Sequence, residues 1–250
     1  MSVNIVLVGT SHPGNIGSAA RAMKNMGLDR LRLVAPERFP ATEATVMAAG
    51  ADDVLGRARV FSDVTSAVAD CGLVVGTTAR SRHLPWRVVE PRQAAREIAG
   101  ASATGEVAVL FGAERTGLTN EDIERCQLLL TIPTGQAYGS LNVAMAVAIV
   151  AYEILLASRG EEDATAARGI PLASAIEMER FYEHLERVLE EIDFRDRTGE
   201  GHLMARIRRL FNRAVLDQNE MNILRGILTS VQGRRRRAGE PHLPPEGPSR

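Results

Sequence analysis

The sequence predicts an α/β fold with a parallel sheet flanked by helices, followed by a small all-helical extension. Up to residue 158, short apolar runs alternate with helical patterns, and this alternation is typical of parallel sheets, whose crossover connections carry helices. After Arg159 the strand patterns end and amphipathic helix patterns take over. A chain of 250 residues, 45% hydrophobic and 24% charged, is sufficient for one large domain with an appendage.

The predicted strands are short apolar runs. Runs of this kind between helical patterns indicate strands that are buried on both faces of the sheet. The run at 58–61 is the weakest candidate. In chain order, the predicted strands are 4–9, 31–34, 58–61, 73–77, 107–112 and 128–132.

Helix signals stand between these strands. Pro91 suits the first turn of a helix, where a missing N–H costs no hydrogen bond. Gly27 and Gly100 suit the position just after a helix end, and Thr119 with Asp122 forms a weak capping box. The predicted short helices are 17–27, 41–50, 63–71, 91–100 and 119–126.

The segment 141–157 is the most apolar helix pattern in the chain. It is short for a membrane span, and Asn142 and Glu153 would be costly in hydrocarbon. We therefore expect a helix that is buried on most sides, either in the core or at a subunit interface.

The carboxy-terminal part divides into three segments. Residues 159–175 are polar and rich in small residues, which predicts a linker. Residues 176–232 form the helical extension, and 233–250 are a basic, Pro-rich tail that we expect to be disordered. The first predicted helix of the extension has an apolar face formed by Phe181, Leu185, Val188 and Ile192, and the second covers about 203–214. The third begins near Asp217, which forms a capping box with Glu220. Its inward-facing residues are Met221, Leu224, Leu228 and Val231.

Composition argues against several classes of protein. The net charge of −1 provides no global basic field, so a nucleic-acid partner would need a local patch. Cys71 and Cys126 are far apart and have no His at ligand spacing, so we expect neither a metal site nor a disulfide framework. The amino terminus lacks the basic region and apolar core of a signal peptide, and we expect a cytoplasmic protein.

Four loops follow predicted strands, at 9–17, 76–82, 112–118 and 133–142. Open α/β sheets bind ligands beyond the carboxyl ends of their strands, so these loops are the candidate site. The first is rich in glycine but has neither GxGxxG nor GxxxxGK[ST]. A generic anion site at the helix start and a plain turn both remain open for it.

The other loops carry polar groups that can be interpreted in two ways. Arg80 and Arg82 are either solvated charges or phosphate contacts. Ser140 is either a helix cap or a ligand-facing residue. His12 is a weak candidate base because no carboxylate is evident to orient it, and His83 is more typical of packing or surface positions.

Three stretches in order resemble the motifs of a known enzyme class. "NIGSAARAMKNMG", "VLFGAERTGLTNE" and "IPTGQAYGSLNVAMAV" are similar to motifs one, two and three of the SPOUT class of S-adenosylmethionine-dependent RNA methyltransferases, and within it to the TrmH-like ribose 2′-O-methyltransferases. The resemblance covers residues 1–158, which would form the methyltransferase domain.

Further stretches resemble one subgroup of these enzymes. "TSHPGNIGSAARAMKNMGL" almost at the amino terminus, "TTARSRHLPW", "MERFYEHLERVLEEIDF" and "RIRRLFNRAVLDQNEMNILRGIL" are similar to bacterial enzymes that methylate nucleotide 32 (cytidine or uridine) in the tRNA anticodon loop. An enzyme acting on another tRNA position or on ribosomal RNA is the nearest alternative. A non-catalytic RNA-binding protein is an alternative from a different class, and a nucleotide-dependent dehydrogenase is disfavoured by the missing fingerprint.

The resemblance implies a parallel sheet with a carboxy-terminal trefoil knot. Nothing in the periodicity predicts a knot, and general experience is against one. The loops of the knot would bind S-adenosylmethionine. The implied cofactor-binding residues are Thr77, Thr78, Ala79, Gly112, Glu114, Ile132, Gly139, Ser140 and Leu141.

The resemblance also implies catalytic and RNA-binding roles. Arg21 matches the motif-one arginine, and because a free guanidinium has a pKa above about 12 and is a poor base, we expect it to stabilise negative charge and grip a phosphate. Asn15, Ser140 and Asn142 match the other catalytic positions, with Asn142 organising the site more than reacting. The active site would form across a homodimer that includes the helix at 141–157. The expected RNA contacts are Arg80, Arg82, Arg115, Arg206, Arg209 and Arg213.

Overall fold

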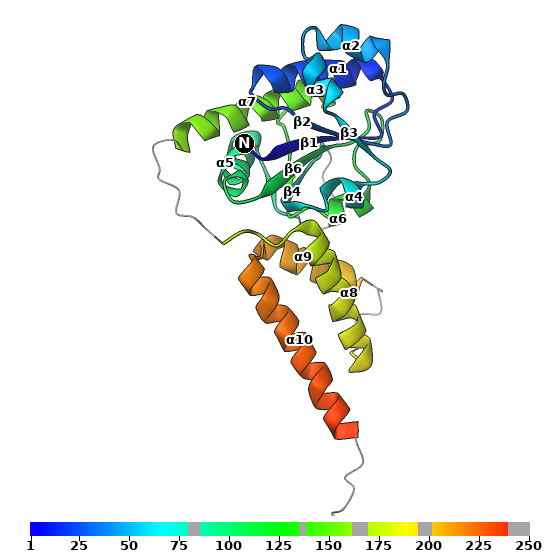
Figure 1. Ribbon diagram of the computed structural model, residues 1–250, viewed down its shortest axis with the longest axis vertical. Coiled ribbons are helices and arrows are strands. Elements are labelled where there is room, and N and C mark those ends of the chain that lie inside the picture. Colours follow the sequence, from blue (N-terminus) through cyan, green and yellow to red (C-terminus); the bar gives the residue numbers. More distant parts are fainter. Residues whose placement is uncertain (80–85, 136–138, 162–169, 195–201, 240–250) are drawn as a thin grey trace, which may run out of the picture.

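A parallel sheet forms the centre of the amino-terminal domain (Figure 1). The computed structural model describes residues 1–79, 86–135, 139–161, 170–194 and 202–239. Within them, seven strands lie in the order β3-β2-β1-β6-β4-β7-β5, and every neighbouring pair is parallel. The strands are β1 (Val3–Val8), β2 (Arg30–Val34), β3 (Arg59–Phe61), β4 (Cys71–Thr77), β5 (Val88–Val89), β6 (Glu106–Phe111) and β7 (Leu128–Leu130).

The fold class and all six predicted strands are confirmed, the weak candidate at 58–61 included. β5 was not predicted, because two residues are too few to form a pattern. The trefoil knot stays a prediction, since the strand order alone does not trace how the later loops pass one another.

Helices cover both faces of the sheet. One hydrophobic cluster joins the sheet to α1, α2, α3, α5 and α7, and a second joins its other face to α4 and α6. α3 was not predicted. The helices of this domain are α1 (Pro13–Asn25), α2 (Thr42–Ala48), α3 (Asp52–Gly56), α4 (Val64–Val68), α5 (Pro91–Ser102), α6 (Asn120–Glu124) and α7 (Val143–Glu161).

The predicted helix signals are largely confirmed. Pro91 opens α5, the Thr119–Asp122 capping box is formed, and Gly27 has a φ of +73° after the end of α1. The prediction for Gly100 was wrong, because α5 continues through it to Ser102. α1 begins earlier than expected, at Pro13, whose fixed φ suits a first helical turn.

The central sheet buries a charge that its apolar sequence pattern conceals. Arg32 of β2 is only 4% exposed. Its guanidinium pairs with Asp70 at 2.5 and 2.9 Å and also donates to the carbonyl oxygen of Ala67. Such pairing is what makes a buried charge tolerable. Cys71 and Cys126 are free and buried, and burial raises the pKa of both thiols.

The helical extension comprises α8 (Ala175–Glu191), α9 (Leu203–Ala214) and α10 (Gln218–Gly239), and it lies beyond α4 and α6 (Figure 1). The predicted cap at Asp217 with Glu220 is present, and α8 begins with a capping box of Ser174 and Glu177 that was not predicted. The extension has its own core, formed by Met178, Phe181, Tyr182, Val188, Met221 and Leu228 with Leu185, Leu224 and Val231 packed against it.

Two expectations for the extension were wrong. Ile192 was placed on the apolar face of α8, but the helix ends at Glu191 and Ile192 is 44% exposed. The tail was expected to be disordered from residue 233, whereas α10 remains helical to Gly239. Residues 240–250 lie outside the described part of the chain.

Candidate active site

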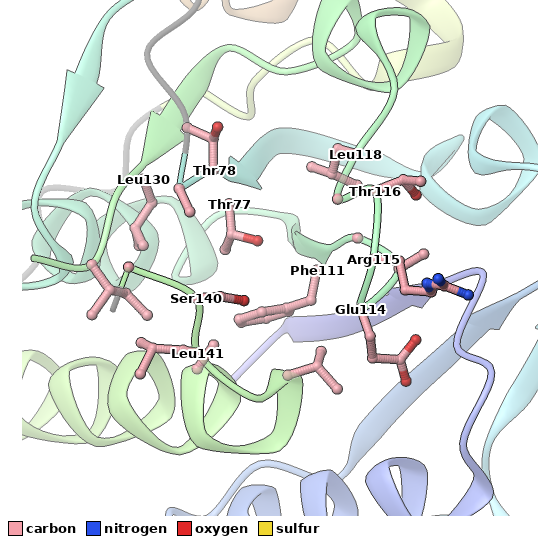
Figure 2. A pocket seen from close by; sticks show the side chains of 18 of the residues that line it. Thr77, Thr78, Phe111, Glu114, Arg115, Thr116, Leu118, Leu130, Ser140 and Leu141 are labelled. Atoms are coloured by element: carbon pink, nitrogen blue, oxygen red, sulfur yellow. The ribbon is translucent and has the colours of Figure 1, made fainter. Parts of the chain in front are cut away.

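A cavity of about 360 Å³ opens at the carboxyl ends of β4, β6 and β7. This is the edge at which parallel sheets bind ligands, and the volume is that of a small-molecule pocket. Figure 2 shows Thr77, Ser140 and Leu141 around it, with Glu114 and Arg115 from the loop after β6. The structure brings all nine predicted cofactor-binding residues to its wall: Thr77, Thr78, Ala79, Gly112, Glu114, Ile132, Gly139, Ser140 and Leu141.

Further wall residues were not predicted. They lie close in sequence to the predicted residues, in β6, in β7, in the loops that follow these strands, and in the first turn of α7. Most of them add apolar or backbone surface to the cavity. They are Phe111, Ala113, Thr116, Gly117, Leu118, Leu130, Thr134, Val143 and Ala146.

The end of β4 is tied to the strands on either side. The Thr77 hydroxyl donates to the carbonyl oxygen of Leu110 in β6 at 2.9 Å, and the Thr78 amide donates to the carbonyl oxygen of Leu130 in β7 at 2.9 Å. These bonds fix the first wall of the cavity relative to the other two.

The loop after β6 depends on glycine. A Cβ at Gly112 would lie 2.2 Å from the backbone of Gly117 and Leu118, so no side chain fits there. Gly117 has a φ of +70°, which favours glycine, and its amide donates to the carbonyl oxygen of Ala113 at 2.8 Å. The loop therefore doubles back tightly and leaves backbone groups on the cavity wall.

The glycines of the first loop serve turns and packing. Gly9 has a φ of +61°, which permits the turn after β1. Gly17 lies within α1, where a Cβ would be 2.0 Å from the carbonyl oxygen of Ala44 in α2, so this glycine allows the two helices to touch. The turn that the sequence allowed is therefore confirmed at Gly9, whereas the generic anion site at the start of α1 stays a prediction.

Four polar residues link this loop to the two later motifs. The Asn15 amide nitrogen donates to Oε1 of Glu114 at 2.9 Å. The backbone amide and hydroxyl of Ser11 both donate to Oε2 of Glu114 at 3.2 Å. The Asn142 amide nitrogen donates to Oδ1 of Asn15 at 2.9 Å. Asn15, Glu114 and Asn142 were predicted site residues, whereas Ser11 was missed because a lone serine before a helix gives no signal.

The Glu114 carboxylate is the charged centre of this group. Partial burial opposes its ionisation, but the hydrogen bonds from Asn15 and Ser11 outweigh burial and hold the pKa of Glu114 below its usual range. Glu114 therefore carries its negative charge at neutral pH.

The cap of α7 is Asn142 and not Ser140. Oδ1 of Asn142 accepts from the backbone amides of Ala144 at 2.9 Å and Met145 at 3.4 Å. Ser140 lies ahead of the helix, exposed on the cavity wall. Of the two interpretations of Ser140, the ligand-facing one is therefore favoured.

The predicted arginines lie in different places. Arg21 is exposed on α1, outside the cavity wall, and no described residue forms an ion pair or hydrogen bond with it. Arg115 is exposed and lines the cavity. Arg80 and Arg82, with His83, lie outside the described residues. His12 precedes α1 and is exposed.

On α9, the three arginines share one face. Arg206 and Arg213 are exposed and Arg209 is partly exposed, at spacings of three and four residues. The opposite face of α9 packs on α8 through Phe211 and Asn212. The arginine face therefore points away from the core of the extension.

The arrangement suits binding of a small ligand with flat apolar and polar parts. Leu130, Ile132 and Leu141 provide apolar surface, while Gly112 and Gly139 expose backbone groups. Within the described residues, no group of acidic, His and Cys side chains is placed to hold a metal ion, and no helix there is long and apolar enough to cross a membrane.

Comparison with known proteins gives matches over nearly the whole chain. Residues 2–152 match the SpoU rRNA methylase family, and residues 176–241 match the carboxy-terminal domain of the tRNA methyltransferase TrmJ. The chain is 47% identical over 240 residues to tRNA (cytidine/uridine/adenosine-2′-O-)-methyltransferase TrmJ of Pseudomonas aeruginosa, covering 92% of this chain and 93% of that protein. It is 48% identical over 235 residues to tRNA (cytidine/uridine-2′-O-)-methyltransferase TrmJ of Photorhabdus laumondii, covering 92% and 97%.

The crystal structure of TrmJ from Z. mobilis is also similar. It matches with a TM-score of 0.79 at 37% identity and covers 93% of this chain and 100% of that one. The likeness therefore includes the helical extension as well as the sheet domain.

Proposed function

The chain belongs to the SpoU methylase family, and we propose that it transfers a methyl group from S-adenosylmethionine to the ribose 2′-hydroxyl of nucleotide 32, cytidine or uridine, in the tRNA anticodon loop. The relatives described above are named as tRNA 2′-O-methyltransferases. The observation that carries the proposal is that all three motif segments meet at one cavity. They are joined there by the hydrogen bonds among Asn15, Glu114 and Asn142.

The cavity fits S-adenosylmethionine in chemistry and size. Leu130, Ile132 and Leu141 would contact the adenine faces, and the backbone beside Gly112 and Gly139 would bind polar edges. When bound, this cofactor supplies an electrophilic methyl group on a sulfonium sulfur, which the ribose oxygen displaces. The chain itself then has to align that oxygen, exclude water and allow its proton to leave.

Arg21 is suited to contact the RNA at the reacting ribose. Its guanidinium is exposed and has no partner among the described residues, so it is available to a phosphate or to a developing negative charge. Asn15, six residues earlier on α1, is held in place by hydrogen bonds with Glu114 and Asn142. Ser140 presents its hydroxyl on the cavity wall and is a further group that can contact substrate.

A homodimer would bring Arg21 of one subunit to the cavity of the other. α7 supports this proposal because its exposed apolar residues recur at helical spacing. Met145 is 59% exposed, Ile149 36%, Tyr152 48% and Leu156 38%. We call these four residues the α7 stripe. In a homodimer, the stripe would be buried against a second copy of the chain.

The extension would bind tRNA through the arginine face of α9. Arg206, Arg209 and Arg213 can contact successive phosphates, as can Arg115 at the cavity. Arg80 and Arg82 remain predicted RNA contacts. Action on tRNA agrees with the cytoplasmic location that the sequence predicts.

The named substrates of the two relatives differ in whether adenosine is included. The 2′-hydroxyl is common to all ribonucleosides, so the position in the RNA matters more than the base for the reaction itself. Methylation of another tRNA position or of ribosomal RNA is therefore the alternative to be tested. The second alternative is a protein that binds RNA without catalysing a reaction. The cavity and the hydrogen bonds among Asn15, Glu114 and Asn142 beside it argue against this alternative.

The direct test is methyl transfer into synthetic tRNA. Protein, labelled S-adenosylmethionine and a tRNA transcript should yield labelled tRNA. A transcript with a 2′-deoxynucleotide at position 32 alone should yield none. Equal labelling of both transcripts would show that another position is methylated, and labelling of neither would contradict methyl transfer to tRNA.

A further inference from the structure

A continuous chain of hydrogen bonds runs from the loop after β1 to the start of α7. It passes from Ser11 to Glu114, then to Asn15, then to Asn142, and ends at the backbone amides of Ala144 and Met145. We call the four side chains of Ser11, Glu114, Asn15 and Asn142 the rim chain. It connects three segments that are far apart in sequence.

The direction of every bond in the rim chain follows from Glu114. An ionised carboxylate only accepts hydrogen bonds, whereas an amide side chain has one donating end and one accepting end. Both Ser11 donors and the Asn15 amide nitrogen point at the Glu114 carboxylate. Asn15 must therefore present its oxygen to Asn142.

The same logic continues to the helix. Because the Asn142 nitrogen donates to Asn15, its oxygen faces the amides of Ala144 and Met145, which need an acceptor. If either asparagine turned over, a donor would face a donor on one side of it and an acceptor would face an acceptor on the other. The cap of α7 thus depends on the Glu114 carboxylate, which acts on it through Asn15 and Asn142.

The start of α7 is also part of the cavity wall. Ser140 and Leu141 precede it, and Val143 and Ala146 of its first turn line the same cavity. The cap therefore acts on a helical turn that carries two residues of the cavity wall.

We propose that Glu114, held by Ser11, is a positioning residue that fixes the orientation of the Asn15 and Asn142 amides and thereby sets the first turn of α7 on the cavity wall. The consequence for methyl transfer rests on the proposed function. The consequence for the shape of the cavity does not.

The test exchanges the carboxylate and the amide between two positions. In Glu114→Gln, the new NH₂ group faces either the donors of Ser11 or the NH₂ of Asn15. In Asn15→Asp, an oxygen faces an oxygen of Glu114. In the double variant Glu114→Gln with Asn15→Asp, the glutamine donates to the aspartate, still accepts from Ser11, and the aspartate accepts from Asn142. Every side chain keeps its size, and the net charge of the double variant is that of the wild type.

Two quantities are measured for the wild type and for each variant. They are the affinity for S-adenosylhomocysteine, which serves as the probe, and the thermal unfolding temperature. Each single variant should bind about tenfold more weakly and unfold at a lower temperature, because a partly buried donor or acceptor is left unpaired. The double variant should return to within about threefold of the wild-type affinity, with its unfolding temperature restored. Ser11→Ala, which keeps the backbone donor, should fall between the wild type and Glu114→Gln.

A double variant no better than the weaker single variant, in both measurements, would overturn the proposal. If a single variant fails to fold, the double variant still decides, because only restored polarity predicts a soluble protein with near wild-type unfolding. Methyl transfer is measured alongside. A wild-type protein that methylates no tRNA, with restoration in the double variant, would refute the proposed function and leave the positioning role standing.

Discussion

At the residue scale, two side chains of α1 have very different surroundings. Both polar atoms of the Asn15 amide form hydrogen bonds: the nitrogen donates to Glu114, and the oxygen accepts from Asn142. Arg21, farther along the helix, is exposed and has no partner among the described residues. Asn15 is thus held by the protein itself, whereas Arg21 is available to a partner molecule.

The first prediction concerns the planar fork of Arg21. Arg21→Lys keeps the charge but removes bidentate contacts, so kcat should fall on the order of 100-fold while binding of S-adenosylhomocysteine is unchanged. Kinetics of methyl transfer and calorimetric binding measure the two effects. Arg96→Lys, an equally conservative change at an exposed position of α5, is the control. Near wild-type kcat in Arg21→Lys would show that the fork is not needed.

The place of a residue at the cavity could be anticipated where it follows a strand, but not where it acts through others, and the roles of these residues stay predictions. Glycine and hydroxyl residues after β4, β6 and β7 had to meet at one edge of the sheet, so the cavity wall could be anticipated. Ser11 could not, because its role depends on Glu114, which is distant in sequence and reaches it only in the fold. The burial of Arg32 could not be predicted for the same reason, since its ion-pair partner Asp70 lies far away in the sequence.

At the element scale, the packing of α1 on α2 depends on the absence of a side chain at Gly17. The backbone of Ala44 lies where a Cβ would be. This close packing holds α1, and with it Asn15 and Arg21, against the rest of the domain.

The second prediction compares two glycines of that helix. Gly17→Ala should lower the free energy of unfolding by about 1–3 kcal/mol, because backbone has to move. Gly14→Ala should be tolerated, since its Cβ would meet flexible side chains and no backbone: Oε1 of Glu43 at 3.0 Å and Cγ of Met47 at 3.4 Å. Urea denaturation of both variants measures the difference, and equal stability of the two would contradict the packing role of Gly17.

The third prediction concerns the α7 stripe. A charge in its centre, as in Ile149→Glu, should convert a dimer to a monomer and abolish methyl transfer, because a charge opposes burial of this face. Light scattering after size-exclusion chromatography measures the mass. Ile223→Glu, at an apolar position of α10 that is 63% exposed, should leave the mass unchanged. An Ile149→Glu variant with the wild-type mass would exclude the α7 stripe as the interface.

Length helped the prediction of elements but did not decide it, since α4 and α6 have only five residues each and were predicted. The long apolar pattern at 141–157 identified α7, and paired capping residues placed the starts of α6 and α10. α3 and β5 have five and two residues, too few to establish a period. The end of α5 was misjudged because a glycine suited to a helix end also fits inside one.

At the scale of the whole molecule, the extension is fastened to the sheet domain by a few specific bonds. The Tyr182 hydroxyl donates to Oδ1 of Asn212 at 2.6 Å, and the Asn212 amide nitrogen donates to the carbonyl oxygen of Glu124 in α6 at 2.9 Å. The Ile176 amide donates to the carbonyl oxygen of Ala69 at 3.1 Å. Asn212 is buried, so its two ends hold α9 in a fixed position relative to the cavity domain.

The fourth prediction tests the arginine face of α9. Changing Arg206, Arg209 and Arg213 to Gln should weaken tRNA binding and reduce the slope of log Kd against log salt by about 1 for each phosphate that is no longer neutralised. S-adenosylhomocysteine affinity should not change. Arg180→Gln with Arg187→Gln, at exposed positions of α8, provides the control. Unchanged tRNA affinity and salt slope would assign this face another role.

The overall architecture was predictable because periodicity and capping act locally. The way the chain is threaded is not local: whether the later loops form a knot depends on the order in which segments pass one another, and no sequence pattern records it. The pairing of Asn212 with Tyr182 and Glu124 is likewise a product of the assembled fold.

The measurement that tests the central claim most directly is mass-spectrometric mapping of methylated riboses in tRNA incubated with the protein and S-adenosylmethionine. A protein of this family with this cavity should add one 2′-O-methyl group, at nucleotide 32, and the Arg21→Ala variant should add none. Absence of any new ribose methylation with the wild-type protein would contradict the proposed function.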